Sequence, residues 1–193
     1  MNVPFFNYQH IFNSREDKLI GIIKDVGNRG AFILQKDLEE FEKNLAEYIG
    51  VKYAVGVANG TDALILGAKA IGISRGDEVI MPSHTYIASP ASIYLLGGSP
   101  ILTECGEDGM MDPEDIAKRI TKNTKAIMPV HINGRTCDMD RIFKISEEHN
   151  IPIIEDAAQG LGSKFKGVGA GTFGLFGLEI KKIFFPSCWN FLI

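Results

Sequence analysis

Short apolar runs alternate with amphipathic stretches along most of the chain. The apolar runs are bounded by turn residues, as is typical of buried strands, and they lie at residues 53–58, 78–81, 101–104, 125–130 and 151–155. Between them, apolar residues recur at helical spacing, which predicts helices over residues 61–71, 86–96 and 138–149 and another beginning at 112. Such alternation implies right-handed crossovers. The pattern predicts an α/β fold with a mostly parallel sheet covered by helices on both faces.

Two amphipathic helices are expected before the sheet. The first carries an apolar stripe from Leu19 to Val26 and is broken by the glycines at 27–30, and the second ends at Gly50. Residues 1–13 are aromatic and irregular, which suggests an arm laid over another surface. We therefore expect an N-terminal arm with lead-in helices at residues 1–50 and an α/β domain at residues 51–177.

Two local signals refine the predicted helices. Asp112 followed by Pro113 indicates a helix start, because Asp is a good N-cap and Pro suits the first helical position. Pro90 is compatible with the helix predicted over 86–96 only if it lies in the first turn.

The run from Ile151 to Gly160 delivers two carboxylates, Glu155 and Asp156, at the predicted carboxyl end of a buried strand. In an open α/β sheet, ligands bind at that edge. A buried anion there is costly unless a cation or strong donor meets it, and a protonated ring nitrogen of a cofactor would be such a partner. The alternative is that Asp156 caps a following helix or holds a loop.

Composition is that of an ordinary globular protein. The 193 residues are 45% hydrophobic and 23% charged, and the net charge of -4 leaves no basic footprint for nucleic acid. No apolar run has the length of a membrane span, and the N-terminus lacks the features of a signal peptide. The three cysteines are widely spaced, without metal-binding spacing. We expect a cytoplasmic protein that binds neither nucleic acid nor membrane.

Three turns could carry binding residues. Gly60, Thr61 and Asp62 follow a predicted strand and open a helix, so that backbone N–H groups and the Thr61 hydroxyl could hold an anion. The same residues could form a simple helix N-cap. Tyr86 could stack on a planar ring or belong to the core. His84 and His131 could contact a ligand or be satisfied within the protein.

Residues 169–174 match the spacing G-x-G-x-x-G. A dinucleotide fingerprint follows an apolar strand and precedes a second strand with an acid at a set distance, and neither condition is met. A flexible loop is the better interpretation. An NAD-type oxidoreductase therefore remains only a remote alternative.

Together these stretches resemble the DegT/DnrJ/StrS-type nucleotide-sugar aminotransferases, fold-type I enzymes that use pyridoxal phosphate (PLP). The matching stretches occur in the family's order and spacing up to about Gly177, and they are 58–64, 76–80, 82–86, 124–131, 137–140, 154–159 and 171–174. The resemblance implies an α/β large domain, present here incompletely. It also implies transfer of an amino group from glutamate to a keto nucleotide-sugar in polysaccharide, lipopolysaccharide or deoxyamino-sugar synthesis, by an intact enzyme that is a homodimer.

The resemblance also assigns roles to matching positions. The turn formed by Gly60, Thr61 and Asp62 would hold the cofactor phosphate. Tyr86 would stack on the pyridine ring, and Gln159 would contact the ring hydroxyl. Asp156 would pair with the protonated ring nitrogen, in agreement with the physical reading of its position.

After Gly177 the resemblance is lost. Cys188 stands where the family has the lysine that holds the cofactor covalently, and Ile183 stands where it has a phosphate-binding serine. We interpret residues 178–193 as an aberrant tail produced by a disturbed reading frame, with the small C-terminal domain absent. This predicts a truncated, inactive form with no catalytic residue of its own. The alternative is a non-catalytic protein that keeps a PLP or sugar pocket.

Overall fold

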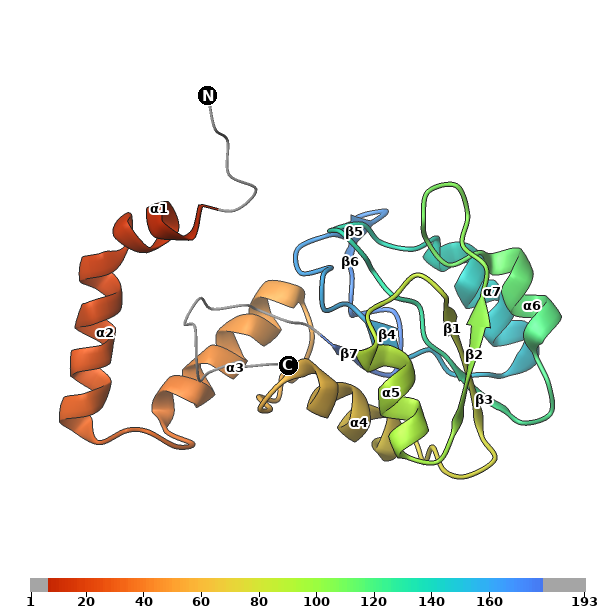
Figure 1. The fold of residues 1–193 in the computed structure, drawn as a ribbon, viewed down its shortest axis with the longest axis horizontal. Helices are drawn as coiled ribbons and strands as arrows, with labels where there is room; N and C mark the ends of the chain where they lie inside the picture. The colour runs from red at the N-terminus through yellow and green to blue at the C-terminus, as the bar shows by residue number, and fades with distance from the viewer. Residues whose placement is uncertain (1–6, 179–193) are drawn as a thin grey trace. The chain divides into compact units, whose positions relative to one another are not determined.

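The computed structural model of the protein describes residues 7–178 (Figure 1). The expectations that concern Ile183, Cys188 and the tail beyond residue 178 therefore lie outside the described residues. Within the described part, residues up to Phe41 form one compact unit and those from Glu42 onward form another. Helix α3 (Lys36–Ile49) begins in the first unit and continues into the second.

The first unit is helical. It contains α1 (Tyr8–Asn13), α2 (Glu16–Arg29) and the start of α3. The expectation of an irregular arm is wrong for α1, because the Asn7 side chain accepts a hydrogen bond from the backbone N–H of His10 and starts a short helix. Helix α2 also runs through Gly27 and ends only at Gly30, whose φ of 63° provides the left-handed C-cap.

The second unit is built on a parallel sheet. Its strands are β1 (Glu78–Pro82), β2 (Ser99–Thr103), β3 (Thr124–Ile127), β4 (Glu155–Asp156) and β7 (Gly177–Leu178). The order β2-β1-β3 is continued by parallel bridges from Ile127 to Ile153 and from Val130 to Asp156, and β4 then pairs with β7. All of these pairings are parallel, as the sequence predicts.

Helices cover both faces of this sheet (Figure 1). Helices α4 (Gly60–Ala70) and α5 (Ala88–Leu95) contribute to one core, and α6 (Pro113–Arg119) and α7 (Met139–His149) contribute to the other. Along β1, Val79 and Met81 enter the first core whereas Ile80 enters the second. This alternation follows from the two-residue period of a strand. The predicted α/β architecture is confirmed.

Local signals at the helix starts are also confirmed. Asp112 caps α6 by accepting a hydrogen bond from the N–H of Glu114, and Pro113 occupies the first helical position. Asp138 caps α7. Pro90 is the third residue of α5 and therefore lies in the first turn, where its missing N–H costs nothing.

Several predicted strands differ in extent from the observed ones, and β2 begins at Ser99 instead of at residue 101. Residues 53–58 form no named strand, and Val57 alone among them makes an isolated β-bridge. Strand β3 stops before Pro129, and of the run 151–155 only Glu155 lies in β4, which also includes Asp156. Pro129 and Pro152 supply the physical reason, because a residue without an N–H cannot donate to a ladder.

One hairpin was not predicted. Strands β5 (Lys164–Phe165) and β6 (Val168–Gly169) pair antiparallel across Lys166 and Gly167, which have φ angles of 49° and 88°. Within residues 7–178, no helix combines the length and apolar character needed to cross a bilayer.

Candidate functional site

A pocket of about 810 Å³ lies at the carboxyl edge of the sheet. Its walls come from the start of α4, the loop between β1 and α5, the segments that follow β3 and β4, and the end of β7. The lining residues are Asn59, Gly60, Thr61, Leu64, Thr85, Tyr86, Ala88, Val130, Asp156, Ala158, Gln159, Leu161 and Leu178. Five of the six residues predicted to bind a cofactor therefore face one pocket, and Asp62 does not.

Asp156 is the buried charge of this pocket, with 4% of its surface exposed. Its carboxylate accepts hydrogen bonds from Ser89 Oγ at 2.8 Å and from the N–H of Ala158 at 3.2 Å. Burial raises its pKa, although both hydrogen bonds act in the opposite direction. No helix begins between Asp156 and residue 178, so Asp156 is not a helix cap, although its bond to Ala158 does hold a turn. Such a carboxylate favours a cationic ligand.

The first turn of α4 offers donors to an anion. Asn59 caps the helix by accepting from the N–H of Asp62 at 2.9 Å, and its Nδ2 donates to the Asp62 carboxylate at 2.7 Å. The N–H groups of Gly60 and Thr61 belong to the first turn and have no acceptor within the helix. The N-cap interpretation and the anion-binding interpretation are therefore compatible. Asp62 serves the cap instead of lining the pocket.

The remaining candidate residues differ in whether they line the pocket and in which hydrogen bonds they already make. Tyr86 lines it with 70% of its surface exposed. Gln159 Oε1 accepts from the N–H of Asn133 at 3.1 Å, which leaves the side-chain amide N–H₂ to face a ligand. His84 is absent from the lining and donates through Nδ1 to the carbonyl of Gly109 at 3.1 Å. It is a satisfied loop residue.

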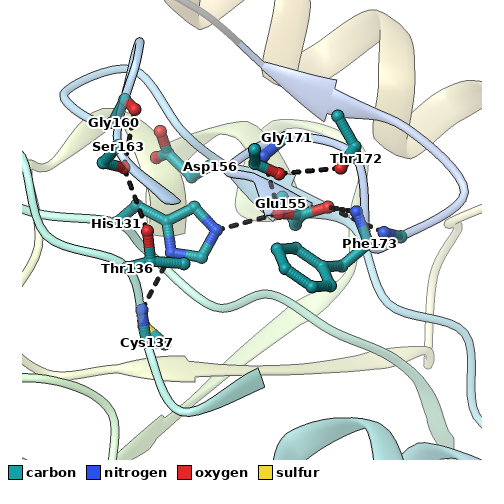
Figure 2. Close-up of polar contacts among 12 residues, drawn as sticks. His131, Thr136, Cys137, Glu155, Asp156, Gly160, Ser163, Gly171, Thr172 and Phe173 are labelled. Atoms are coloured by element: carbon teal, nitrogen blue, oxygen red, sulfur yellow. Dashed lines mark hydrogen bonds and ion pairs between the residues drawn. The ribbon is translucent and has the colours of Figure 1, made fainter. Parts of the chain in front are cut away.

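Glu155 occupies a second, closed environment beside the pocket (Figure 2). It is 1% exposed. Its Oε2 accepts from His131 Nε2 at 2.9 Å and from the N–H of Gly171 at 2.8 Å. Its Oε1 accepts from the N–H groups of Phe173 and Gly174 at 2.6 and 2.7 Å. Four donors thus satisfy this carboxylate completely within the protein.

The tautomer of His131 follows from its two contacts. Nδ1 accepts the N–H of Cys137 at 3.2 Å, so the ring proton resides on Nε2 and is donated to Glu155. The imidazole is neutral in this arrangement. Burial raises the pKa of the Cys137 thiol to about 12, and its Sγ donates to the carbonyl of Val130. Within residues 7–178, hydrogen bonds and not a counter-ion satisfy the Glu155 carboxylate.

The G-x-G-x-x-G spacing has its explanation in this network. Gly171 and Phe173 turn their N–H groups toward Glu155 (Figure 2), and the N–H of Gly174 also donates to it. A Cβ at Gly174 would lie 2.5 Å from the Ile153 carbonyl oxygen, so only glycine permits this approach. The loop N–H groups bind the carboxylate of Glu155. The prediction of a flexible loop is therefore wrong. The glycine spacing also gives no support for dinucleotide binding.

Sequence reasoning missed Ser89 and the Glu155 network. Two serines, Ser89 and Ser92, stand fully buried in the otherwise apolar helix α5. A buried serine needs a partner, which was the available signal for Ser89. The signal for Glu155 was a charge that ends an apolar strand ahead of a glycine-rich segment.

Comparison with known proteins identifies the family. The sequence profile of the "DegT/DnrJ/EryC1/StrS aminotransferase family" matches residues 13–179. The chain belongs to this family. One relative is the dTDP-3-amino-3,6-dideoxy-alpha-D-galactopyranose transaminase of Aneurinibacillus thermoaerophilus, 40% identical over 89% of this chain and 48% of its own length. Another is the GDP-perosamine synthase of Caulobacter vibrioides, 43% identical over 80% of this chain and 42% of its own length.

A solved structure with a bound cofactor shares the fold. The crystal structure of NtdA from Bacillus subtilis with bound cofactor PMP superposes with a TM-score of 0.89 at 31% identity, over 99% of this chain and 44% of that chain. The family is PLP-dependent, and the resemblance inferred from the sequence is confirmed. The chain spans about half the length of the curated relatives it matches.

Replacing the closed carboxylate should destabilise this DegT-family fold. We expect Glu155→Gln to lower the free energy of unfolding by about 3 kcal/mol, because an amide N–H₂ would face N–H donors in a buried site. Urea unfolding measures the effect. The control is Glu148→Gln, which removes only an exposed pair with Lys144 and should change stability by less than about 0.5 kcal/mol. Equal stabilities for the two variants would contradict this assignment.

Asp156 should make the cofactor-free chain less stable as pH rises. Its folded pKa is raised above the ordinary value of 3.8, so between these two values the folded chain binds more protons than the unfolded chain. Its stabilising contribution is therefore complete below pH 3.8 and is lost as pH rises through the folded pKa. Asp156→Asn removes this titration. Urea unfolding of both proteins from about pH 4 to about pH 8 should show that the wild type loses free energy of unfolding relative to Asp156→Asn as pH rises. A difference that does not change with pH would refute the effect.

Proposed function

We propose that this chain binds PLP and forms the cofactor half of a nucleotide-sugar aminotransferase site. One observation supports this most strongly: Asp156, a buried carboxylate with no cationic hydrogen-bond partner among residues 7–178, shares a pocket with the open first turn of α4. PLP carries a ring nitrogen that can be cationic and a phosphate that is anionic. The pocket therefore offers a complementary group to each end of the cofactor.

Individual residues fit the parts of PLP. The N–H groups of Gly60 and Thr61, with the Thr61 hydroxyl, would hold the phosphate at the positive end of the α4 dipole. Tyr86 would cover the ring, and the Gln159 amide would donate to the ring hydroxyl. Asp62 would act indirectly, through its bonds to the Asn59 cap. When bound, PLP supplies the electron sink that stabilises a carbanion.

Asp156 is better suited than Glu155 to hold a proton on the ring nitrogen. Their side chains point to opposite faces of β4 (Figure 2). Glu155 already accepts from four donors, whereas Asp156 accepts from two and has a pKa raised by burial. A protonated ring nitrogen would therefore be stabilised more beside Asp156 than beside Glu155.

The substrates are proposed from the relatives. Their names specify sugars linked to dTDP and to GDP, so we propose a keto nucleotide-sugar as amine acceptor, with glutamate as donor. Cys188 at the expected lysine position suggests that PLP is held here without a covalent bond and that the chain alone does not turn over. Cys105 and Cys137 are free thiols, which supports a cytoplasmic location.

PLP titration followed by absorbance tests this function. We expect saturable binding that dialysis reverses and that borohydride does not fix to a lysine. Asp156→Asn should weaken binding by at least about tenfold, because the ring cation loses its charged partner. The control is Asp140→Asn, which removes an exposed pair with Lys166 and should leave binding unchanged.

Three outcomes would count against this proposal. No binding would refute the cofactor site, and equal loss in both aspartate variants would refute the role of Asp156. Fixation to a lysine by borohydride would refute the non-covalent, inactive form.

We also propose that the chain forms a homodimer through α5. Ile87 and Tyr94, seven residues apart on one helical face, are 69% and 75% exposed, and Leu95 beside them is 66% exposed. Exposed apolar side chains on one helix favour a partner, and we take a second copy as that partner because the family resemblance implies a homodimer for an intact enzyme.

Analytical ultracentrifugation tests the dimer. Tyr94→Asp should dissociate it by placing a charge among the exposed apolar side chains of α5, whereas Lys144→Asp, at an exposed position of α7, should not. A wild type that is monomeric at all concentrations would contradict this proposal.

A further inference from the structure

We propose that Ser89, supported by Thr85, is a positioning residue that orients Asp156 and keeps its carboxylate ionised for a cationic ring. This inference rests on the proposed function, since it deepens the description of the same site. It concerns a residue on α5, a different element from the strand that carries Asp156.

The geometry forms a directed chain of hydroxyl groups. Ser89 is completely buried, and its Oγ donates to Asp156 Oδ2 at 2.8 Å. A hydroxyl has one proton, so the second contact of Ser89 Oγ, to Thr85 Oγ1 at 2.7 Å, must be one that it accepts. Thr85 therefore donates to Ser89, and Ser89 donates to Asp156. Hydrogen bonds aligned in this way polarise one another and strengthen the last one.

Few other groups stabilise the Asp156 charge. Among the described residues, the titratable groups on the elements around it are Glu155, its neighbour on β4, and His131, which follows β3 and donates to Glu155. Helix α5 carries no charged residue, β7 carries none, and Asp62 at the start of α4 is bonded to Asn59. Among the described residues, the hydrogen bonds from Ser89 and from the N–H of Ala158 lower the Asp156 pKa against the effect of burial, and His131 adds a smaller electrostatic contribution in the same direction.

The same helix contains a natural comparison. Ser92 is as deeply buried as Ser89, but its Oγ donates to the Ser89 backbone carbonyl at 2.7 Å and does not contact Asp156. A buried serine that serves only helix stability would behave like Ser92. An effect specific to Asp156 would separate the two positions.

The test is a carboxyl ¹³C NMR titration of Asp156 in the full 193-residue chain without cofactor, with the signal assigned by its loss in Asp156→Asn. We expect Ser89→Ala to move the Asp156 midpoint to higher pH. Thr85→Val should move it in the same direction by less, and Ser92→Ala should leave it at the wild-type value. The Thr85→Val result carries the test even if Ser89→Ala does not fold.

PLP affinity gives a second readout. Ser89→Ala should weaken PLP binding at neutral pH on the order of tenfold, and Ser92→Ala should not. An unchanged midpoint in Ser89→Ala, or an equal shift in Ser92→Ala, overturns the role of Ser89. A wild type that binds no PLP would refute the proposed function, while the NMR midpoints would still decide whether Ser89 controls Asp156.

Discussion

The pairing of Glu155 with His131 and three backbone N–H groups is the interaction on which the carboxyl edge of the sheet depends. It ties β4 to the segment following β3 and to the loop that leads into β7. Residues from β4, from the segment following β3 and from β7 itself line the pocket. Because an unpaired buried carboxylate is so costly, this network leaves the surrounding backbone little freedom.

Two adjacent carboxylates thus have opposite relations to their surroundings. Glu155 is fully satisfied and serves the architecture, whereas Asp156 is buried with fewer donors and a raised pKa. A carboxylate that is to bind a cationic ligand must not have all of its hydrogen-bonding capacity used by the protein itself. The strand's two-residue period places these two kinds of carboxylate side by side without letting them face each other.

Much of this could be predicted from the sequence, since apolar periodicity identified β1, β3 and the helices α4 to α7. The exact extent of the strands could not, because Pro129 and Pro152 interrupt ladders whose partners are distant in sequence. Strand-end position and family resemblance predicted the binding residues Asp156, Gly60, Thr61, Tyr86 and Gln159, and the structure places all five in one pocket. Ser89 and the Glu155 network were missed, because contacts across 67 and 16 residues leave no local pattern.

The loop at residues 169–174 has a broader consequence. Its glycines create a concave row of amide groups like those that cradle phosphates, yet the anion they enclose is covalently part of the same polypeptide. The glycine spacing therefore indicates only that the backbone N–H groups of the loop can surround an anion. In this chain the anion is not a bound ligand but the side chain of Glu155, fourteen positions before the loop begins.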